Sequence, residues 1–222
     1  MLPIYLDITG FNVLVLGGGY EATKKVGRLL RHGAGKIVVY SLDFSSELRG
    51  LAAEGLVELI EGDVRDLDRV SRLIDWADLI IYTVPGLEDV ERWVVERCKR
   101  GRKLHIMSTN ASITQAALPV EIELHGLRFT VFSGGKSTLV ALKALEMIRE
   151  CLGDRRELAL LLEAMYYLKV YMKKRGVPYK VRMMLYRELF RDEALNNYIL
   201  SGDLDAAKRY IRRYVDSAME RG

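Results

Sequence analysis

The sequence predicts an α/β protein whose first half forms a parallel sheet covered by helices on both faces. Five short apolar runs alternate with amphipathic stretches between residues 12 and 107. The first run ends at three consecutive glycines, Gly17, Gly18 and Gly19. Half of the 222 residues are hydrophobic, which is enough for a sizeable core and excludes an intrinsically disordered chain.

The strands and helices of this half follow from the local residue pattern. Apolar runs without strict alternation are typical of parallel strands buried on both sides. Strands joined by helices in this order form a doubly wound, Rossmann-like domain. We expect strands at residues 12–16, 36–40, 57–60, 79–83 and 103–107, and helices at residues 21–32, 45–54, 67–74 and 90–100.

The glycine turn predicts a dinucleotide-binding site. Gly17-x-Gly19-x-x-Ala22 lies between the first strand and the first helix, which is where the dinucleotide fingerprint occurs. Gly17 allows the tight turn, Gly19 lets the backbone approach a pyrophosphate, and Ala22 lets helix and strand pack closely. Backbone N–H groups at the helix start then hold the phosphates. The predicted cofactor contacts here are Gly17, Gly18, Gly19, Tyr20, Glu21 and Ala22.

Two residues after the second strand are candidates for binding the cofactor ribose. An acidic residue usually follows about 20 residues after the fingerprint. Asp43 stands slightly late for this role, so Ser41 is an alternative, and Asp43 could equally be a loop residue or a helix N-cap. No Arg follows immediately, which favours NAD over NADP.

The last third of the chain is basic and predicted to be helical. Residues 153–222 hold 15 basic and 10 acidic side chains, whereas residues 1–152 hold 19 and 20. Such a field attracts an anion, for example a polycarboxylate, although a solvated helix face gives the same pattern. Before it, residues 118–132 are expected to form two short strands around His125-Gly126.

A second anion site is predicted just before the helix expected at residues 138–150. Ser133-Gly134-Gly135-Lys136-Ser137 offers exposed backbone N–H groups and a lysine. The alternative is a strand-to-helix turn in which Ser137 caps the helix.

Composition excludes several classes of protein. A net charge of +4 is too small for a dedicated nucleic-acid binder, and no apolar run is long enough for a membrane span. The start of the chain lacks the pattern of a secretory signal, and Cys98 and Cys151 form no disulfide framework, so a cytoplasmic location is expected. The three histidines lack metal-ligand spacing, so no metal site is predicted.

Several motifs together resemble the precorrin-2 dehydrogenase/sirohydrochlorin ferrochelatase family, which includes the N-terminal region of siroheme synthase. They are Leu2-Pro3 with a short apolar stretch, the Gly17–Lys25 segment, Pro119 followed by the Ser133–Ser137 segment, and Ser201-Gly202-Asp203 before a helix expected at residues 204–214. The resemblance spans nearly the whole chain. It implies an NAD-binding Rossmann-like domain at 1–112, a dimerisation segment at 113–151 and a helical domain at 152–222.

The resemblance also implies a reaction and a homodimer. This chain departs from the family's residues at two places. The reaction would be NAD-dependent oxidation of precorrin-2, a tetrapyrrole, to sirohydrochlorin. The family has an Asp soon after the fifth strand, where this chain has Thr109 beside Asn110. After the fourth strand it favours Ala-Thr-Asp or Ala-Thr-Asn, where this chain has Thr83 and Val84, which we include among the cofactor contacts.

The missing Asp leaves the catalytic base open. Thr109 and Asn110 occupy the right place but are poor bases, and His105 has a suitable pKa although strand alternation could point it elsewhere. These three residues are the catalytic candidates. The alternative function is a relative that binds NAD or a tetrapyrrole as a carrier, regulator or chelatase.

Overall fold

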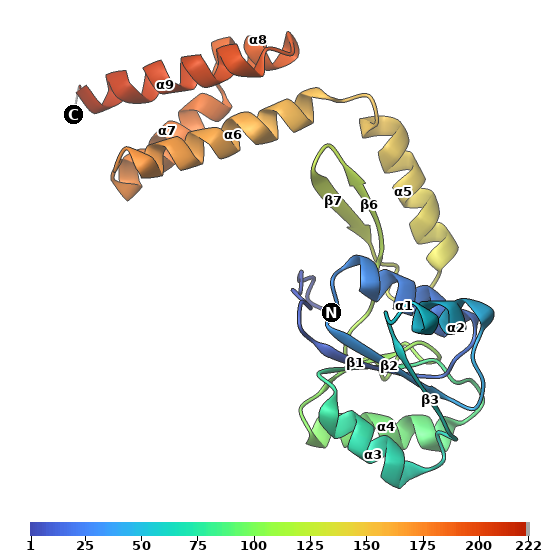
Figure 1. Cartoon of the computed structure of the whole chain (residues 1–222). Helices are drawn as coiled ribbons and strands as arrows, with labels where there is room; N and C mark the ends of the chain where they lie inside the picture. Colours follow the sequence, from blue (N-terminus) through green and yellow to red (C-terminus); the bar gives the residue numbers. More distant parts are fainter. Residues whose placement is uncertain (221–222) are drawn as a thin grey trace. The chain divides into compact units, whose positions relative to one another are not determined.

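The computed structural model describes residues 1–220 and divides into two compact units, which meet in the sequence between Leu118 and Pro119. The first unit contains the five-stranded parallel sheet, with strand order β3-β2-β1-β4-β5 (Figure 1). The crossover from β3 to β4 passes to the other side of β1, as in a doubly wound fold. Its elements are β1 (Asn12–Leu16), α1 (Tyr20–Arg31), β2 (Lys36–Ser41), α2 (Ser46–Ala53), β3 (Glu58–Glu61), α3 (Leu67–Trp76), β4 (Leu79–Tyr82), α4 (Glu88–Arg100) and β5 (Leu104–Met107).

The two faces of the sheet bury separate cores, because successive side chains of a strand point to opposite faces. Val13 and Val15 of β1 pack with Ala22 and Val26 of α1 on the face that α1 and α2 cover. Leu14 and Leu16 pack with side chains of α3 and α4 on the opposite face (Figure 1). The prediction of a parallel sheet with helices on both faces is confirmed.

The second unit contains an antiparallel hairpin and five helices among its described residues. The hairpin turns at His125 and Gly126, which both have positive φ angles of 55° and 75°, as a two-residue hairpin turn requires. The predicted pair of short strands is therefore present. The elements are β6 (Val120–Leu124), β7 (Leu127–Val131), α5 (Thr138–Leu152), α6 (Glu157–Lys174), α7 (Tyr179–Phe190), α8 (Glu193–Leu200) and α9 (Leu204–Glu220).

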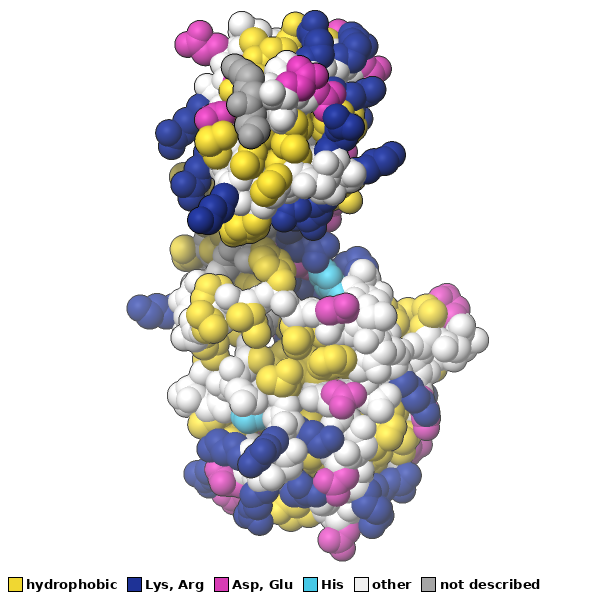
Figure 2. Space-filling model, turned by 90° about the vertical axis from the view of Figure 1, so that its left-hand side faces the viewer, with side chains coloured by type: hydrophobic (Ala, Val, Ile, Leu, Met, Phe, Trp, Pro, Cys, Tyr) yellow, Lys and Arg dark blue, Asp and Glu magenta, His cyan; other side chains and the backbone are white. Residues whose placement is uncertain are grey.

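The last four helices share one hydrophobic core, in which α6 packs against α7, α8 and α9. Fully buried side chains include Leu168 of α6 and Ile211 and Val215 of α9. Figure 2 shows Lys and Arg side chains spread over this part of the molecule, with exposed hydrophobic side chains between them. The three-part division at residues 112 and 151 stays a prediction.

Candidate active site

The glycine turn lies where β1 ends beside β4, and it is shaped by close packing. Gly17 has a φ angle of +107°, and a Cβ at this position would overlap the hydroxyl of Thr83 and crowd Val84. The backbone N–H of Thr83 and its hydroxyl both donate to the carbonyl oxygen of Leu16, each at 2.9 Å. Thr83 and Val84 therefore contact the turn itself.

Gly18 and Gly19 differ sharply in their surroundings. A Cβ at Gly18 would overlap the carbonyl oxygen of Asp43, whereas a Cβ at Gly19 would meet nothing within 4 Å. Gly19 is the N-cap residue of α1, and no side chain caps this helix end. The first backbone N–H groups of α1 are thus available to a ligand, and the helix dipole favours an anion there. This open, uncapped helix start fits the pyrophosphate of a dinucleotide.

The loop after β2 forms a pocket together with the glycine turn. An open pocket of about 440 Å³ is lined by Gly18, Gly19 and the stretch from Ser41 to Ser45. The Ser45 N–H donates to the carbonyl oxygen of Gly18 at 2.9 Å, and the Ser45 and Thr23 hydroxyls are 2.8 Å apart. These contacts tie the start of α2 to the start of α1. Ser41 and Asp43, the two ribose candidates, thus lie in the same pocket as the glycines.

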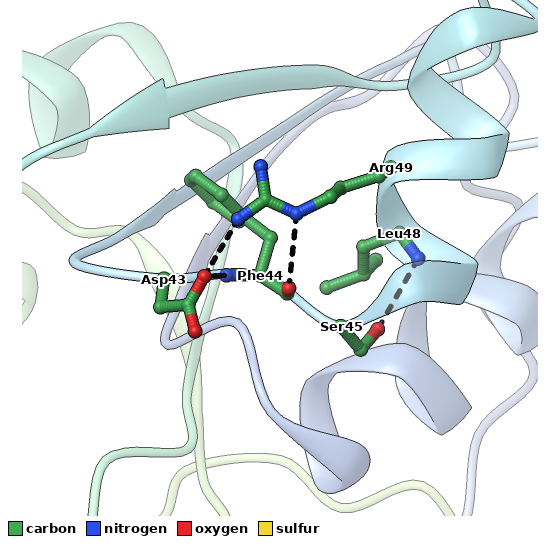
Figure 3. A network of polar contacts seen from close by, with 5 residues as sticks. All are labelled: Asp43, Phe44, Ser45, Leu48 and Arg49. Atoms are coloured by element: carbon green, nitrogen blue, oxygen red, sulfur yellow. Dashed lines mark hydrogen bonds and ion pairs between the residues drawn. The ribbon is translucent and has the colours of Figure 1, made fainter.

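Asp43 is a loop residue and not the N-cap of α2, which is Ser45 (Figure 3). Its Oδ1 accepts hydrogen bonds from the Phe44 N–H at 2.7 Å and from the Arg49 guanidinium at 2.6 Å. The Phe44 N–H and then Arg49 hold the pKa of the Asp43 carboxyl below its ordinary value, so it is ionised at neutral pH. Arg49, which sequence reasoning did not single out, reaches back from α2 and also donates to the Phe44 carbonyl oxygen.

The remaining fingerprint residues form the first turn of α1. Ala22 is fully buried against the sheet, whereas Tyr20 is 70% exposed. Glu21 pairs with Lys25 at 2.9 Å, and this hydrogen bond is the main reason that the pKa of Glu21 is lowered. All predicted cofactor contacts therefore lie at one edge of the sheet.

The three catalytic candidates follow or belong to β5 but have different environments. Thr109 is exposed, and its hydroxyl donates to the carboxylate of Glu91 in α4. Asn110 accepts hydrogen bonds from the Ser112 N–H and hydroxyl at 3.0 and 2.6 Å. His105 is only 2% exposed, and its Nδ1 lies 3.3 Å from the carbonyl oxygen of Lys103. Thr109 is thus open to a ligand, and His105 is covered.

The Ser133–Ser137 segment belongs to the second unit and forms the turn from β7 to α5. Ser137 caps α5 by accepting the Val140 N–H at 3.3 Å, and the Ser133 hydroxyl accepts the Ser137 N–H at 3.0 Å. Lys136 is exposed, and Gly134 has a positive φ angle. The turn thus has the predicted cap, and its role in anion binding stays a prediction.

Four tyrosines of α6 and α7 show two kinds of environment. Tyr167 and Tyr171 stack at 5.9 Å between ring centroids, and the Tyr171 hydroxyl donates to Asp216 of α9. Tyr166 and Tyr179 are 62% and 69% exposed. The first pair is structural, and the second pair is open to solvent, with the Arg182 guanidinium 6.0 Å from the centroid of the Tyr179 ring.

Two further observations concern membrane spans and metal ligands. No helix within residues 1–220 is long and apolar enough to cross a membrane. Over the same residues, no three His, Cys, Asp or Glu side chains are grouped as metal ligands would be.

The fold and the site together define a dinucleotide-binding α/β protein with a helical extension. Comparison with known families agrees with this class. The profile of a family described as "Putative NAD(P)-binding" matches residues 4–119, and the chain belongs to this family.

Comparison with individual proteins extends the likeness to the second unit. "Putative precorrin-2 dehydrogenase" of Methanocaldococcus jannaschii is 24% identical over 87% of this chain and 91% of its own length. A siroheme synthase of Citrobacter koseri is 23% identical over 99% of this chain, which spans 46% of that longer protein. The solved structure titled "SirC, precorrin-2 dehydrogenase" superimposes with a TM-score of 0.70 at 22% identity, covering 96% of this chain and all of that one. The predicted fold and family resemblance are thereby confirmed.

Proposed function

We propose that this protein is an NAD-dependent dehydrogenase that oxidises precorrin-2 to sirohydrochlorin in siroheme biosynthesis. The observation that carries the proposal is the likeness to a named precorrin-2 dehydrogenase through both units, and not through the nucleotide-binding unit alone. The open start of α1 beside a pocket lined by an ionised Asp43 supports a dinucleotide as the oxidant.

The chain's own residues contribute position and electrostatics to this reaction. NAD, when bound, accepts a hydride from the substrate. The N–H groups at the start of α1 hold its phosphates, and Ser41 or Asp43 binds the ribose. Asp43 carries a negative charge that opposes the additional phosphate of NADP, so NAD is the preferred cofactor.

The basic second unit supports an acidic substrate. Precorrin-2 carries several carboxylates, and the excess of Lys and Arg after residue 152 attracts such a molecule. The Lys136 side chain and the backbone N–H groups of Gly134 and Gly135 are the proposed carboxylate contacts, because the Ser137 N–H already donates to the Ser133 hydroxyl. Exposed Tyr166 and Tyr179 can pack against a flat macrocycle.

We further propose that the protein works as a cytoplasmic homodimer. Exposed apolar side chains along α5 support association, because large apolar patches on a helix are usually covered. They include Leu139, Val140, Leu142 and Met147, with exposed fractions of 78%, 66%, 49% and 59%. Sedimentation of the wild type and of Leu139→Arg tests this, with a shift to the monomer expected for the variant.

The test of the reaction is direct. The purified chain is mixed with freshly generated precorrin-2 and NAD, and the absorbance of NADH and sirohydrochlorin is followed. We expect turnover that is lost in Gly19→Asp, which places a negative charge at the open start of α1 where the pyrophosphate would lie. Binding of NAD and sirohydrochlorin without any oxidation contradicts the proposal and favours a carrier, regulator or chelatase.

A further inference from the structure

The carboxylate of Glu91 is buried in an unusual way. Glu91 belongs to the first turn of α4 and is only 5% exposed, the one acidic side chain within residues 1–220 that is buried. Its neighbours Glu88 and Asp89 are not buried. Burying an acidic group is costly unless a hydrogen bond compensates, so the contacts of Glu91 need an explanation.

One side-chain contact explains it. The hydroxyl of Thr109 donates to Oε1 of Glu91. Thr109 itself is exposed, so the buried carboxylate is reached from solvent through an exposed hydroxyl. A hydroxyl that donates to a carboxylate keeps its own oxygen lone pairs as acceptors for a second partner.

Thr109 lies beyond the end of β5, on the side of the sheet edge toward which the nicotinamide half of a bound dinucleotide is directed. Thr109 follows β5, and the neighbouring Ser108 N–H donates to the carbonyl oxygen of Tyr82 at 2.9 Å. The next residue, Thr83, packs against Gly17. In a doubly wound fold a dinucleotide lies across this edge of the sheet, so with its adenosine half at β2 its other half is directed toward β4 and β5.

We propose that Thr109 and Glu91 form a proton relay for the oxidation, an inference that rests on the proposed dehydrogenase function. Precorrin-2 loses two hydrogens, one as the hydride that reduces NAD and one as a proton. As the substrate bond to that proton breaks, Oγ1 of Thr109 takes the proton, and the hydroxyl's own proton passes to Oε1 of Glu91. Glu91 is left neutral and later returns the proton to water along the same path.

Thr109 supplies contact with the substrate, and Glu91 supplies the basicity that a hydroxyl lacks. A threonine hydroxyl alone is too weak a base, and a buried carboxylate alone does not touch a substrate. Thr109 is therefore the catalytic residue, and Glu91 is a positioning residue that acts through it. Glu91 is buried, and a hydrogen bond to a buried carboxylate is electrostatically stronger than one in water.

The nearby Tyr82 does not compete as the proton acceptor. Burial, and then the charges of Glu91 and Glu88, raise the pKa of Tyr82 to about 12. Its hydroxyl therefore stays protonated at neutral pH and lies 3.5 Å from the carbonyl oxygen of Leu87.

The kinetic test uses Thr109→Val and Glu91→Gln, which keep the shapes of the side chains but remove the donor and the proton acceptor. We expect kcat to fall about 100-fold in each, with KM for precorrin-2 and Kd for NAD changed less than about threefold. The double variant is expected to be no slower than the slower single variant, since the two residues act as a unit. Thr109→Ser restores most of the activity, and Glu96→Gln, an exposed site on the same helix, leaves it unchanged.

A second readout needs neither cofactor nor substrate. Thr109→Val leaves the Glu91 carboxylate without its donor, so it should lower the Tm of the free protein, and adding Glu91→Gln should recover part of the loss. Additive changes in Tm overturn the relay, and so does a folded Thr109→Val or Glu91→Gln variant with wild-type kcat. A wild type that does not oxidise precorrin-2 overturns the proposed function and the relay together, whereas unchanged variants of an active wild type overturn the relay alone.

Discussion

Thr83 and Gly17 lie against each other where β4 and β1 end, so closely that the threonine hydroxyl occupies the space that a side chain at residue 17 would need. Thr83 is fixed there by its hydrogen bonds to the Leu16 carbonyl oxygen. Gly17 is therefore required by packing as well as by its φ angle of +107°. The turn that presents the start of α1 to a ligand thus depends on the neighbouring strand.

Gly17→Ala should lower both stability and cofactor affinity. A Cβ would displace Thr83 and strain the backbone, and together these effects cost about 2–4 kcal/mol of unfolding free energy. Urea unfolding and NAD titration measure the two effects. Gly19→Ala is the matched control, since its Cβ enters open space, and it should unfold within about 0.5 kcal/mol of the wild type. Equal unfolding free energies of the two variants would contradict this account of the turn.

Asp43→Asn should shift cofactor preference from NAD toward NADP. The change removes the negative charge from the pocket wall and leaves the Arg49 guanidinium beside it, which can attract the phosphate that distinguishes NADP. We expect the ratio of the two Kd values to move by about tenfold or more, as a change of roughly 1.4 kcal/mol would give.

The control for this prediction is the double variant Asp43→Asn/Arg49→Gln, which lacks both charges and should gain less affinity for NADP. Fluorescence titration with each cofactor gives the Kd values. An unchanged ratio in Asp43→Asn would mean that Asp43 has no part in discriminating between the cofactors.

The sheet could be predicted from the sequence because its strands are short apolar runs bounded by glycines or charged residues. β1 was predicted with its observed limits, since the glycines end it, and α1 was predicted within one residue at either end. The sequence predicts the start of α4 at residue 90 and the end of α9 at residue 214, whereas α4 begins at Glu88 and α9 runs to Glu220. The first turn of α4 is acidic, and the last five residues of α9 are mostly polar or small, so neither stretch carries apolar periodicity that marks the boundary.

The contacts of the site could be predicted only where sequence neighbours make them. The pocket joins residues on either side of the β1–β2 crossover, which the doubly wound topology brings together. Glu91 was missed because it stands among the acidic residues of a helix start, which are normally exposed, and only the fold brings it to Thr109. The pairing of Arg49 with Asp43 was missed because it depends on how the loop turns back over α2.

The core of the helical unit gives a stability prediction. Ile211 of α9 is fully buried in the core that α6 to α9 share, so Ile211→Ala should leave a cavity and cost about 2–5 kcal/mol of unfolding free energy. Arg209→Ala, an exposed change on the same helix, should cost about 0.5 kcal/mol or less. Urea unfolding followed by circular dichroism measures both. Equal losses would contradict the placement of Ile211 in the core.

The two cysteines should differ in reactivity. Cys98 of α4 is fully buried, and burial raises the pKa of its thiol to about 12, whereas Cys151 of α5 is exposed. Because the thiolate is the reactive form, a thiol reagent at pH 8 should modify Cys151 alone in the native protein and both residues in urea. Cys151→Ser should abolish the native reaction. Modification of Cys98 at the same rate as Cys151 would contradict its burial.

The raised pKa of Cys98 also predicts a loss of stability at alkaline pH. The unfolded thiol ionises near pH 8.5, while the folded thiol keeps its proton up to about pH 12, so the unfolded state is favoured as pH rises through this window. Between pH 8 and pH 10 this group alone should remove about 1.5–2 kcal/mol of unfolding free energy. Urea unfolding of the wild type and of Cys98→Ala at both pH values isolates the contribution. The variant is less stable at pH 8 but should lose less on going to pH 10, and parallel losses would show that the Cys98 thiol ionises alike in both states.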